Sequence, residues 1–241
     1  MTPELPPAPL YLIPSRIADT EPLEVLPLSI KKVVDSIDHY IVENEKTTRE
    51  FIRRVHPGKS QPTLHFSIYN QYTDEAEIPD LLKPCKEGFP VGLISDAGAP
   101  AIGDPGELLI LKAHEYKIRV IPLVGPSSVV LALMASGLNG NQFTFHGFLP
   151  AEKSVRKKKL ATLGKRALKG ETQIFMESPL QNDKFLEDIL STCLDETLLC
   201  IATHITSPDE EIYTQSVGEW KNQPPSLDKR PTLFLLGSSP L

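Results

Sequence analysis

At 241 residues, 40% apolar and 23% charged, the chain can form one large or two compact domains and has the composition of an ordinary soluble protein. A formal net charge of −6 excludes a protein that binds nucleic acid through an overall positive charge. No run approaches the ~18 apolar residues that cross a bilayer, and the opening MTPELPPAPLYLIP lacks the basic and apolar regions of a signal peptide. We therefore expect a cytoplasmic protein with no membrane segment.

The first half of the chain alternates between strand-like and helix-like stretches, after a Pro-rich leader that we expect to be loose. The predicted strands are Leu10–Ile13, His39–Val42, Leu64–Ile68, Val91–Ile94 and Ile118–Leu123. The predicted helices are Leu28–Ser36, Arg49–Val55 capped by Thr48, Ile78–Lys86 and Glu107–Lys117. Such alternation is typical of an α/β fold with a mostly parallel sheet and right-handed crossovers.

A second alternating pattern begins after the last of these strands, so we divide the chain into two α/β domains, 1–122 and 123–241. The predicted strands of the second domain are Phe143–Phe148, Gln173–Glu177, Leu198–Thr203 and Thr232–Leu236. Its predicted helices are Ser127–Ser136, Lys157–Leu168 and Asn182–Cys193.

One stretch, VGLISDAGAPAIGDPG at Val91–Gly106, stands out as a ligand-binding candidate. A buried strand that ends in small residues presents bare backbone beyond the carboxyl edge of an α/β sheet. Asp96 could accept hydrogen bonds from a hydroxyl or amine there, whereas Asp104 and Pro105 are typical of the N-cap and first position of the next helix. The chain has no G-x-G-x-x-G, which disfavours the usual dinucleotide site.

Two further features each allow a functional and a structural interpretation. Ser127 and Ser128 open an apolar helix, where they could bind an anion or simply cap the helix. The segment Ala151–Gly170 holds eight Lys or Arg against one Glu. Because Leu160, Leu163 and Ala167 recur at helical spacing, these cations form either a solvated helix face or a phosphate-binding patch.

Cys85, Cys193 and Cys200 are odd in number and, like the six histidines, lack the spacing of metal ligands. We therefore predict reduced thiols and no metal site.

Three stretches in this order, ISDAGAPAIGDPG, IRVIPLVGPSSVVLALMASGL and FTFHGFLP, resemble the tetrapyrrole methylase superfamily of S-adenosylmethionine-dependent methyltransferases. Within it they look like the bacterial branch that methylates a ribose 2′-hydroxyl during processing of small-subunit ribosomal RNA. The resemblance implies two α/β domains with the cofactor in a cleft between them, and a homodimer. The cofactor contacts that it implies are Pro14, Ile17, Asp96, Ala97, Gly98, Ala99, Gly125, Ser127, Ser128, Met176, Ala202 and Thr232.

The chain departs from that branch mainly on the substrate side. The branch's T-P-I-G-N is Ser15–Asp19 here, its E-D-T-R-x-T is Glu43–Thr48, and the Arg of its E-S-P-x-R is Gln181. Glu43 is the carboxylate that remains, so we expect it to act as the base or to orient the acceptor. The expected RNA contacts are Lys46, Arg156, Lys157 and Lys158.

Three hypotheses follow. The overall similarity and the basic segment favour an RNA methyltransferase. The altered substrate side favours a methyltransferase for a small molecule, and the lost charges favour a cofactor-binding protein without transfer activity.

Overall fold

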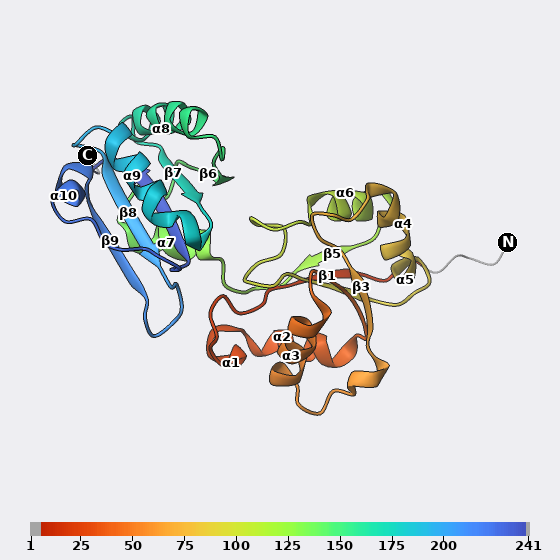
Figure 1. Ribbon diagram of the computed structural model, residues 1–241. Coiled ribbons are helices and arrows are strands. Elements are labelled where there is room, and N and C mark those ends of the chain that lie inside the picture. Colours follow the sequence, from red (N-terminus) through yellow and green to blue (C-terminus); the bar gives the residue numbers. More distant parts are fainter. Residues whose placement is uncertain (1–5, 240–241) are drawn as a thin grey trace. The chain divides into compact units, whose positions relative to one another are not determined.

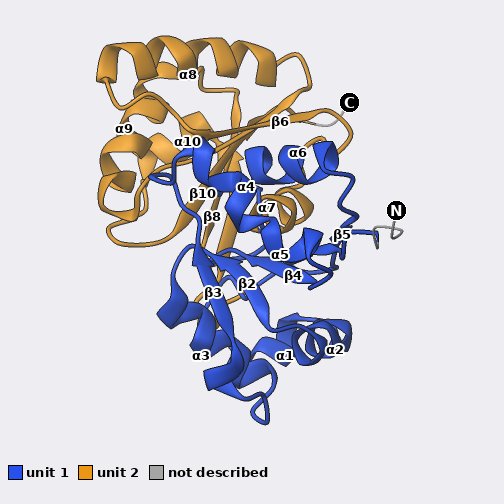
Figure 2. Ribbon diagram, turned by 90° about the vertical axis from the view of Figure 1, so that its right-hand side faces the viewer, with its two compact units in different colours: residues 1–127 blue, residues 128–241 orange. Residues whose placement is uncertain are grey.

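The computed structural model describes residues 6–239, so residues 1–5 of the Pro-rich leader lie outside the described chain. The chain forms two compact units, 1–127 and 128–241 (Figures 1 and 2). The sequence placed the boundary at 122/123, at the end of a strand, whereas the units part in the loop that follows it.

Unit 1 is built on a parallel sheet, as the alternating pattern predicts. Its strands have the order β3-β2-β4-β1-β5, and every neighbouring pair is parallel. Their bounds are β1 Leu10–Ile13, β2 His39–Val42, β3 His65–Ile68, β4 Val91–Ile94 and β5 Val120–Pro122. The helical segments are α1 Pro22–Val25, α2 Leu28–Ser36, α3 Glu45–Val55, η1 Gln61–Thr63, η2 Glu75–Glu77, α4 Ile78–Leu81, α5 Lys83–Lys86 and α6 Glu107–Glu115.

Helices cover both faces of this sheet (Figure 1). Alternate strand residues face opposite sides, so Ile13 and Ile94 pack with α2 and α3, while Leu10 and Leu93 pack with α4, α5 and α6. The carboxyl ends of β1, β2 and β4 lie together at one edge of the sheet, because Ile13 and Val42 are both paired with Ile94.

The extents of two predicted helices in unit 1 are wrong. Helix α3 begins at Glu45 rather than Arg49, because the Asn44 side chain accepts from the backbone N–H groups of Lys46 and Thr47 and is the true cap. Thr48, the expected cap, is buried within the helix. The single helix expected at Ile78–Lys86 is two short ones, because Pro84 has no N–H to continue the first.

Unit 2 has a mixed sheet of order β6-β7-β10-β8-β9, in which only β6 and β7 are parallel neighbours. Helices α8, α9 and α10 cover one face around Phe175 and Phe234, and α7 covers the other around Ile174 and Leu235. The strands are β6 Phe143–Phe148, β7 Thr172–Met176, β8 Leu198–Thr203, β9 Glu211–Ser216 and β10 Thr232–Gly237. The helical segments are α7 Ser128–Ser136, α8 Lys153–Ala167, η3 Pro179–Gln181, α9 Asn182–Thr192 and α10 Val217–Asn222.

The sequence missed β9 and α10 and placed the start of α8 four residues too late. Helix α8 starts at Lys153 because the Glu152 carboxylate accepts from the Ser154 N–H and caps it. Strand β9 alternates exposed and half-buried residues at the sheet edge, so it carries little apolar signal.

The three cysteines are free and buried, and burial raises the pKa of Cys85 to about 11, of Cys193 to about 12 and of Cys200 to about 11.

Between residues 6 and 239, no helix is long and apolar enough to span a membrane. The same residues contain no cluster of three or more His, Cys, Asp or Glu suited to a metal ion.

Candidate active site

The predicted site residues of unit 1 gather at the carboxyl edge of its sheet. Pro14 and Ile17 lie in the loop after β1, Asp96–Ala99 lie in the loop after β4, and Glu43 directly follows β2. The Gly98 carbonyl joins the first two loops, since it accepts from the Ser15 N–H at 2.9 Å and from the Ser95 hydroxyl at 3.2 Å. The loops after β1 and β4 are therefore joined directly.

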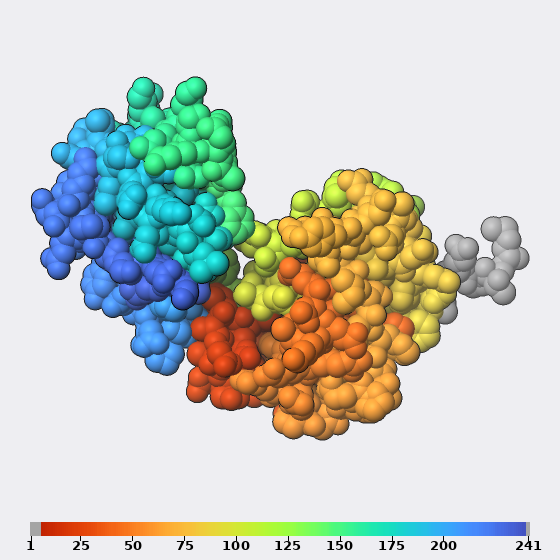
Figure 3. All heavy atoms as spheres, in the orientation of Figure 1, coloured from red at the N-terminus to blue at the C-terminus, as the bar shows by residue number. Residues whose placement is uncertain are grey.

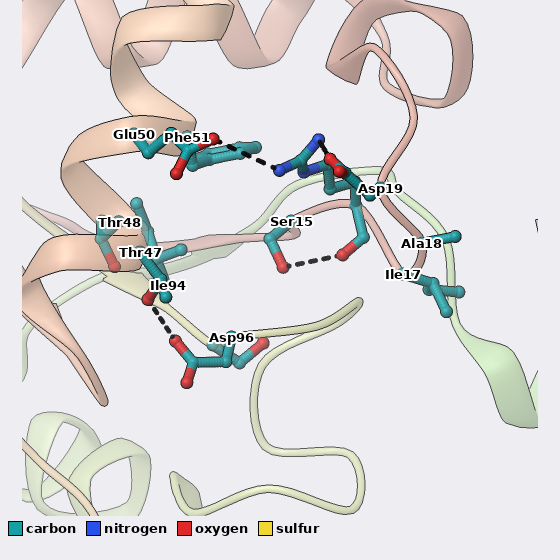
Figure 4. A pocket seen from close by; sticks show the side chains of 12 residues that line it. Ser15, Ile17, Ala18, Asp19, Thr47, Thr48, Glu50, Phe51, Ile94 and Asp96 are labelled. Carbon is teal, nitrogen blue, oxygen red and sulfur yellow. Dashed lines mark hydrogen bonds and ion pairs between the residues drawn. The ribbon is translucent and has the colours of Figure 1, made fainter. Parts of the chain in front are cut away.

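A pocket of about 220 Å³ opens at this edge of the sheet (Figure 4). Its walls are the loop after β1, the first turns of α3 and the start of the loop after β4. The residues that line it are Ser15, Arg16, Ile17, Ala18, Asp19, Thr47, Thr48, Glu50, Phe51, Ile94, Ser95 and Asp96.

Asp96 is held from both sides by the segment that follows β2. The Thr47 hydroxyl donates to Asp96 Oδ1 at 2.8 Å, and the Asp96 N–H donates to Glu43 Oε1 at 3.2 Å. Figure 4 shows the Asp96 carboxylate turned toward Thr47 at the pocket rim. Burial and then the Asp96 charge raise the pKa of Glu43, although the Asp96 N–H opposes this. A carboxylate with a raised pKa is a stronger base, which suits the role expected of Glu43.

Asp104 belongs to the same cluster, and its predicted role as N-cap is wrong. The N-cap of α6 is Gly106, without a side-chain cap. Burial, followed by the charges of Glu43 and Asp96, raises the pKa of Asp104 to about 6, against a hydrogen bond from Ser95 that lowers it. The D-P-G pattern suggested a cap, and nothing in the local sequence shows that the loop folds Asp104 back toward two other carboxyls.

On the far wall of the pocket, Arg16 is tied into an ion network. It pairs with Asp19, donates to the Thr20 carbonyl at 2.8 Å and lies 4.0 Å from Glu50. Arg54 pairs with the same two carboxylates: its Nη1 lies 3.1 Å from Asp19 Oδ1, and its Nη2 lies 2.7 Å from Glu50 Oε1. The network fixes the loop after β1 against α3, and it leaves the pocket with more carboxylates than cations.

The two site glycines serve different ends. Gly98 has a backbone φ of +75°, a conformation that residues with a side chain rarely adopt. Gly125 is required by the protein itself, because a Cβ there would lie 2.3 Å from Pro14 Cβ. The resemblance implies a cofactor contact at Gly125, but close packing against Pro14 already explains the absence of a side chain.

In unit 2, the structure brings Met176, Ala202 and Thr232 together at one edge of the sheet. Leu233 is paired with Met176 on one side and with Ala202 on the other, and Thr232 precedes it. Ser127 is the last residue of unit 1, and Ser128 begins both unit 2 and α7.

The basic residues expected to bind RNA have differing surroundings. Arg156 donates through Nε and Nη2 to Asp188 on α9, at 3.0 and 2.6 Å, and Lys157 donates to the Ser191 hydroxyl at 2.9 Å. Lys158 lies on α8 and is exposed, and Lys46 is exposed in the first turn of α3. Much of the α8 segment lies at the surface that Figure 3 shows. Arg156 and Lys157 thus have structural partners that the sequence could not show.

Comparison with known proteins gives a consistent result. The family model for tetrapyrrole (corrin/porphyrin) methylases matches residues 26–221. Ribosomal RNA small subunit methyltransferase I of Vibrio cholerae is 31% identical over 210 residues, which are 87% of this chain and 69% of that protein. The Haemophilus influenzae protein of the same name is 30% identical over 234 residues, 96% of this chain and 79% of its own.

Solved structures show the same fold. Cobalt precorrin-4 methyltransferase, a cobalamin biosynthetic enzyme, has a TM-score of 0.60 at 17% identity and covers 95% of this chain and 94% of its own. The methyltransferase CobJ has a TM-score of 0.63 at 16% identity and covers 96% and 94%.

Proposed function

The chain belongs to the tetrapyrrole methylase family and is a methyltransferase, and we propose that it methylates a ribose 2′-hydroxyl of small-subunit ribosomal RNA with S-adenosylmethionine as donor. The observation that carries this proposal is that hydrogen bonds hold Asp96 and Glu43 together where the loops after β1, β2 and β4 meet. The relatives of the chain are named as ribosomal RNA methyltransferases. We also propose that the protein is cytoplasmic, as this acceptor would require.

The residues of this edge fit the proposed donor. S-adenosylmethionine carries a sulfonium and an ammonium, and the carboxyls of Glu43, Asp96 and Asp104 give the edge negative charge. Asp96 uses Oδ1 to accept from Thr47, and Oδ2 remains to accept from an amine or hydroxyl. The small residues Ala97, Gly98 and Ala99 let a ligand approach the backbone. The further cofactor contacts that we propose are Pro14, Ile17, Gly125, Ser127, Ser128, Met176, Ala202 and Thr232.

When bound, the donor supplies an electrophilic methyl carbon to a nucleophile in line with the carbon–sulfur bond. The protein has to hold the acceptor oxygen about 3–3.5 Å from that carbon. We assign this orientation to the pocket beside Asp96, and we assign to Glu43 the removal of the hydroxyl proton, which its raised pKa favours.

The charge of the pocket constrains how RNA binds. Carboxylates of Asp19, Glu50 and Asp96 line it, so a ribose hydroxyl is a better occupant than a phosphate. The phosphates must therefore meet cations elsewhere, and exposed lysines such as Lys46 and Lys158 supply them. Arg156 and Lys157 remain proposed contacts, although both also hold α8 against α9.

One departure from the family supports a second candidate, a small-molecule acceptor. Gln181 replaces an arginine of the family motif, so one positive charge for an RNA backbone is missing. A methyl-transfer assay against both acceptor classes separates the two candidates.

The test follows radiolabelled methyl from S-adenosylmethionine into small-subunit ribosomal RNA and, in parallel, into a small-molecule cell extract. Label in the RNA at a ribose supports the proposal, and label only in the small-molecule fraction refutes it. Asp96→Ala should weaken donor binding by about 1–3 kcal/mol, the range for a charge-assisted hydrogen bond, when measured by calorimetry. Asp80→Ala, on the exposed face of α4, is the matched control and should bind as the wild type does.

A further inference from the structure

The first turn of α3 carries a hydroxyl with two possible acceptors. Thr47 follows the Asn44 cap by three residues, and its Oγ1 lies 3.0 Å from the Asn44 carbonyl oxygen and 2.8 Å from Asp96 Oδ1. A threonine hydroxyl has one proton, so it donates to only one of these oxygens at a time. The acceptor that takes the proton decides the role of Thr47.

The start of α3 does not need this hydroxyl. The Thr48 N–H donates to the Asn44 carbonyl at 3.2 Å, which is the first backbone bond of the helix. The Asn44 side chain accepts from the N–H groups of Lys46 and Thr47, at 2.9 and 3.3 Å. Because the cap is complete without it, the Thr47 hydroxyl is left for Asp96, which lies 49 residues further along the chain.

The character of the contact suits a carboxylate that binds a cationic ligand. The side-chain partner that residues 6–239 give Asp96 is a neutral hydroxyl, not a lysine or arginine. A hydroxyl fixes the direction of the carboxylate and leaves its negative charge available, whereas a cation would cancel that charge. In Figure 4, one carboxylate oxygen of Asp96 faces Thr47 and the other points away from it.

The backbone of Asp96 is held separately from its side chain. The Asp96 N–H donates to Glu43 Oε1 at 3.2 Å, and the Gly98 carbonyl accepts from the Ser95 hydroxyl and the Ser15 N–H. None of these bonds involves Thr47. Removal of its hydroxyl should therefore free the carboxylate to rotate without displacing the loop after β4.

We propose that Thr47 is a positioning residue, which orients the Asp96 carboxylate so that Oδ2 is presented to the methyl donor. A side chain already held in the binding orientation does not have to be ordered when the ligand arrives. This inference rests on the proposed function and deepens it, because it names the group that prepares the binding carboxylate.

The test is a double-mutant cycle on the full chain, with S-adenosylmethionine binding measured by calorimetry. Thr47→Val keeps the branched shape and removes the hydroxyl. It should weaken binding about 3- to 10-fold, the effect of one side chain that must be ordered on binding. In an Asp96→Ala background the same substitution should weaken binding no further, because the group that it orients is gone.

Two further variants serve as controls. Thr47→Ser keeps the hydroxyl and should bind as the wild type does. Thr63→Val is the matched control, because the exposed Thr63 hydroxyl makes a similar bond to the Ser60 carbonyl, at 2.9 Å, before the amino end of β3. It should leave the affinity unchanged. The far-ultraviolet circular dichroism of Thr47→Val should match that of the wild type, since α3 is capped by Asn44.

Four outcomes overturn the inference. Unchanged affinity in Thr47→Val overturns it directly. An equal loss with and without Asp96 shows that Thr47 contacts the ligand itself, and a Thr47→Ser variant as weak as Thr47→Val shows that the hydroxyl is not responsible. These three leave the proposed function standing if label still enters ribosomal RNA. A wild type that binds no S-adenosylmethionine overturns both this inference and the proposed methyl donor.

Discussion

The ion pair between α8 and α9 leads to the most demanding prediction. The Asp188 side chain is 2% exposed and that of Arg156 is 12% exposed, and two hydrogen bonds join them. Asp188→Ala leaves a guanidinium buried without its counter-charge. Breaking such a buried pair costs about 3–5 kcal/mol, so the free energy of unfolding of unit 2 should fall by that amount.

Urea unfolding followed by tryptophan fluorescence measures this loss. Trp220 is the chain's single tryptophan, is buried in unit 2 and donates to the Leu199 carbonyl at 2.9 Å, so its emission reports on that unit. With an m-value on the order of 2 kcal/mol/M, the midpoint should move down by roughly 1.5–2.5 M.

Two further variants make the reasoning refutable. Asp195→Ala removes a carboxylate that is 70% exposed and pairs with Lys221, so it should cost less than about 1 kcal/mol. Replacing both buried partners, Arg156→Met with Asp188→Leu, should recover most of the lost stability, because no unpaired charge is left. A midpoint shift below roughly 0.5 M for Asp188→Ala would refute a structural role for the pair.

Three other predictions concern the site and assembly. The pKa of Asp104 is about 6 in the folded chain against a usual value of 3.8, so the folded state binds more protons between those values and stability falls as pH rises through that window. Asp104→Asn should therefore raise the urea midpoint of unit 1, followed by far-ultraviolet circular dichroism because Trp220 reports on unit 2, at pH 7 but not at pH 4. An equal effect at both pH values would contradict this. Gly125→Ala should destabilise the loop after β1 and weaken donor binding, whereas Gly140→Ala, with no atom within 4 Å of an added Cβ, should change neither in calorimetry. The homodimer that the family resemblance implies should appear in sedimentation at micromolar concentration, and a monomer there would count against it.

Short buried strands were the part of the fold that the sequence predicted best. Leu10–Ile13, His39–Val42 and Val91–Ile94 have the predicted bounds, because each is an apolar run between clear turn residues. The edge strand Glu211–Ser216 could not be found in this way, since alternate side chains face water and the tertiary pairing with β8 decides its state.

The candidate site was predicted as a set of loops but not as an arrangement of charges. Asp96 and Glu43 lie together because β2 and β4 are neighbours, which a parallel sheet allows but local sequence does not specify. The position of Asp104 could not be predicted for the same reason, because the sequence D-P-G is compatible both with a helix cap and with a buried acid. The partner of Arg156 lies 32 residues away on another helix, beyond any local pattern.

The place of β10 in unit 2 has a consequence for synthesis. Thr232–Gly237 is the central strand of this sheet and pairs with both β7 and β8. The two halves of the sheet, β6-β7 and β8-β9, therefore cannot be joined until this strand has emerged from the ribosome. Unit 1, whose central strand is Val91–Ile94, has all of its strands once Pro122 is made and can fold first. Until β10 is made, Phe175 and Ile201 lack Phe234, the neighbour that lies between them in the sheet, and the nascent chain carries two apolar strands, β7 and β8, that are not paired with it. A stop codon just before Thr232 would therefore leave a folded first half joined to an aggregation-prone second half.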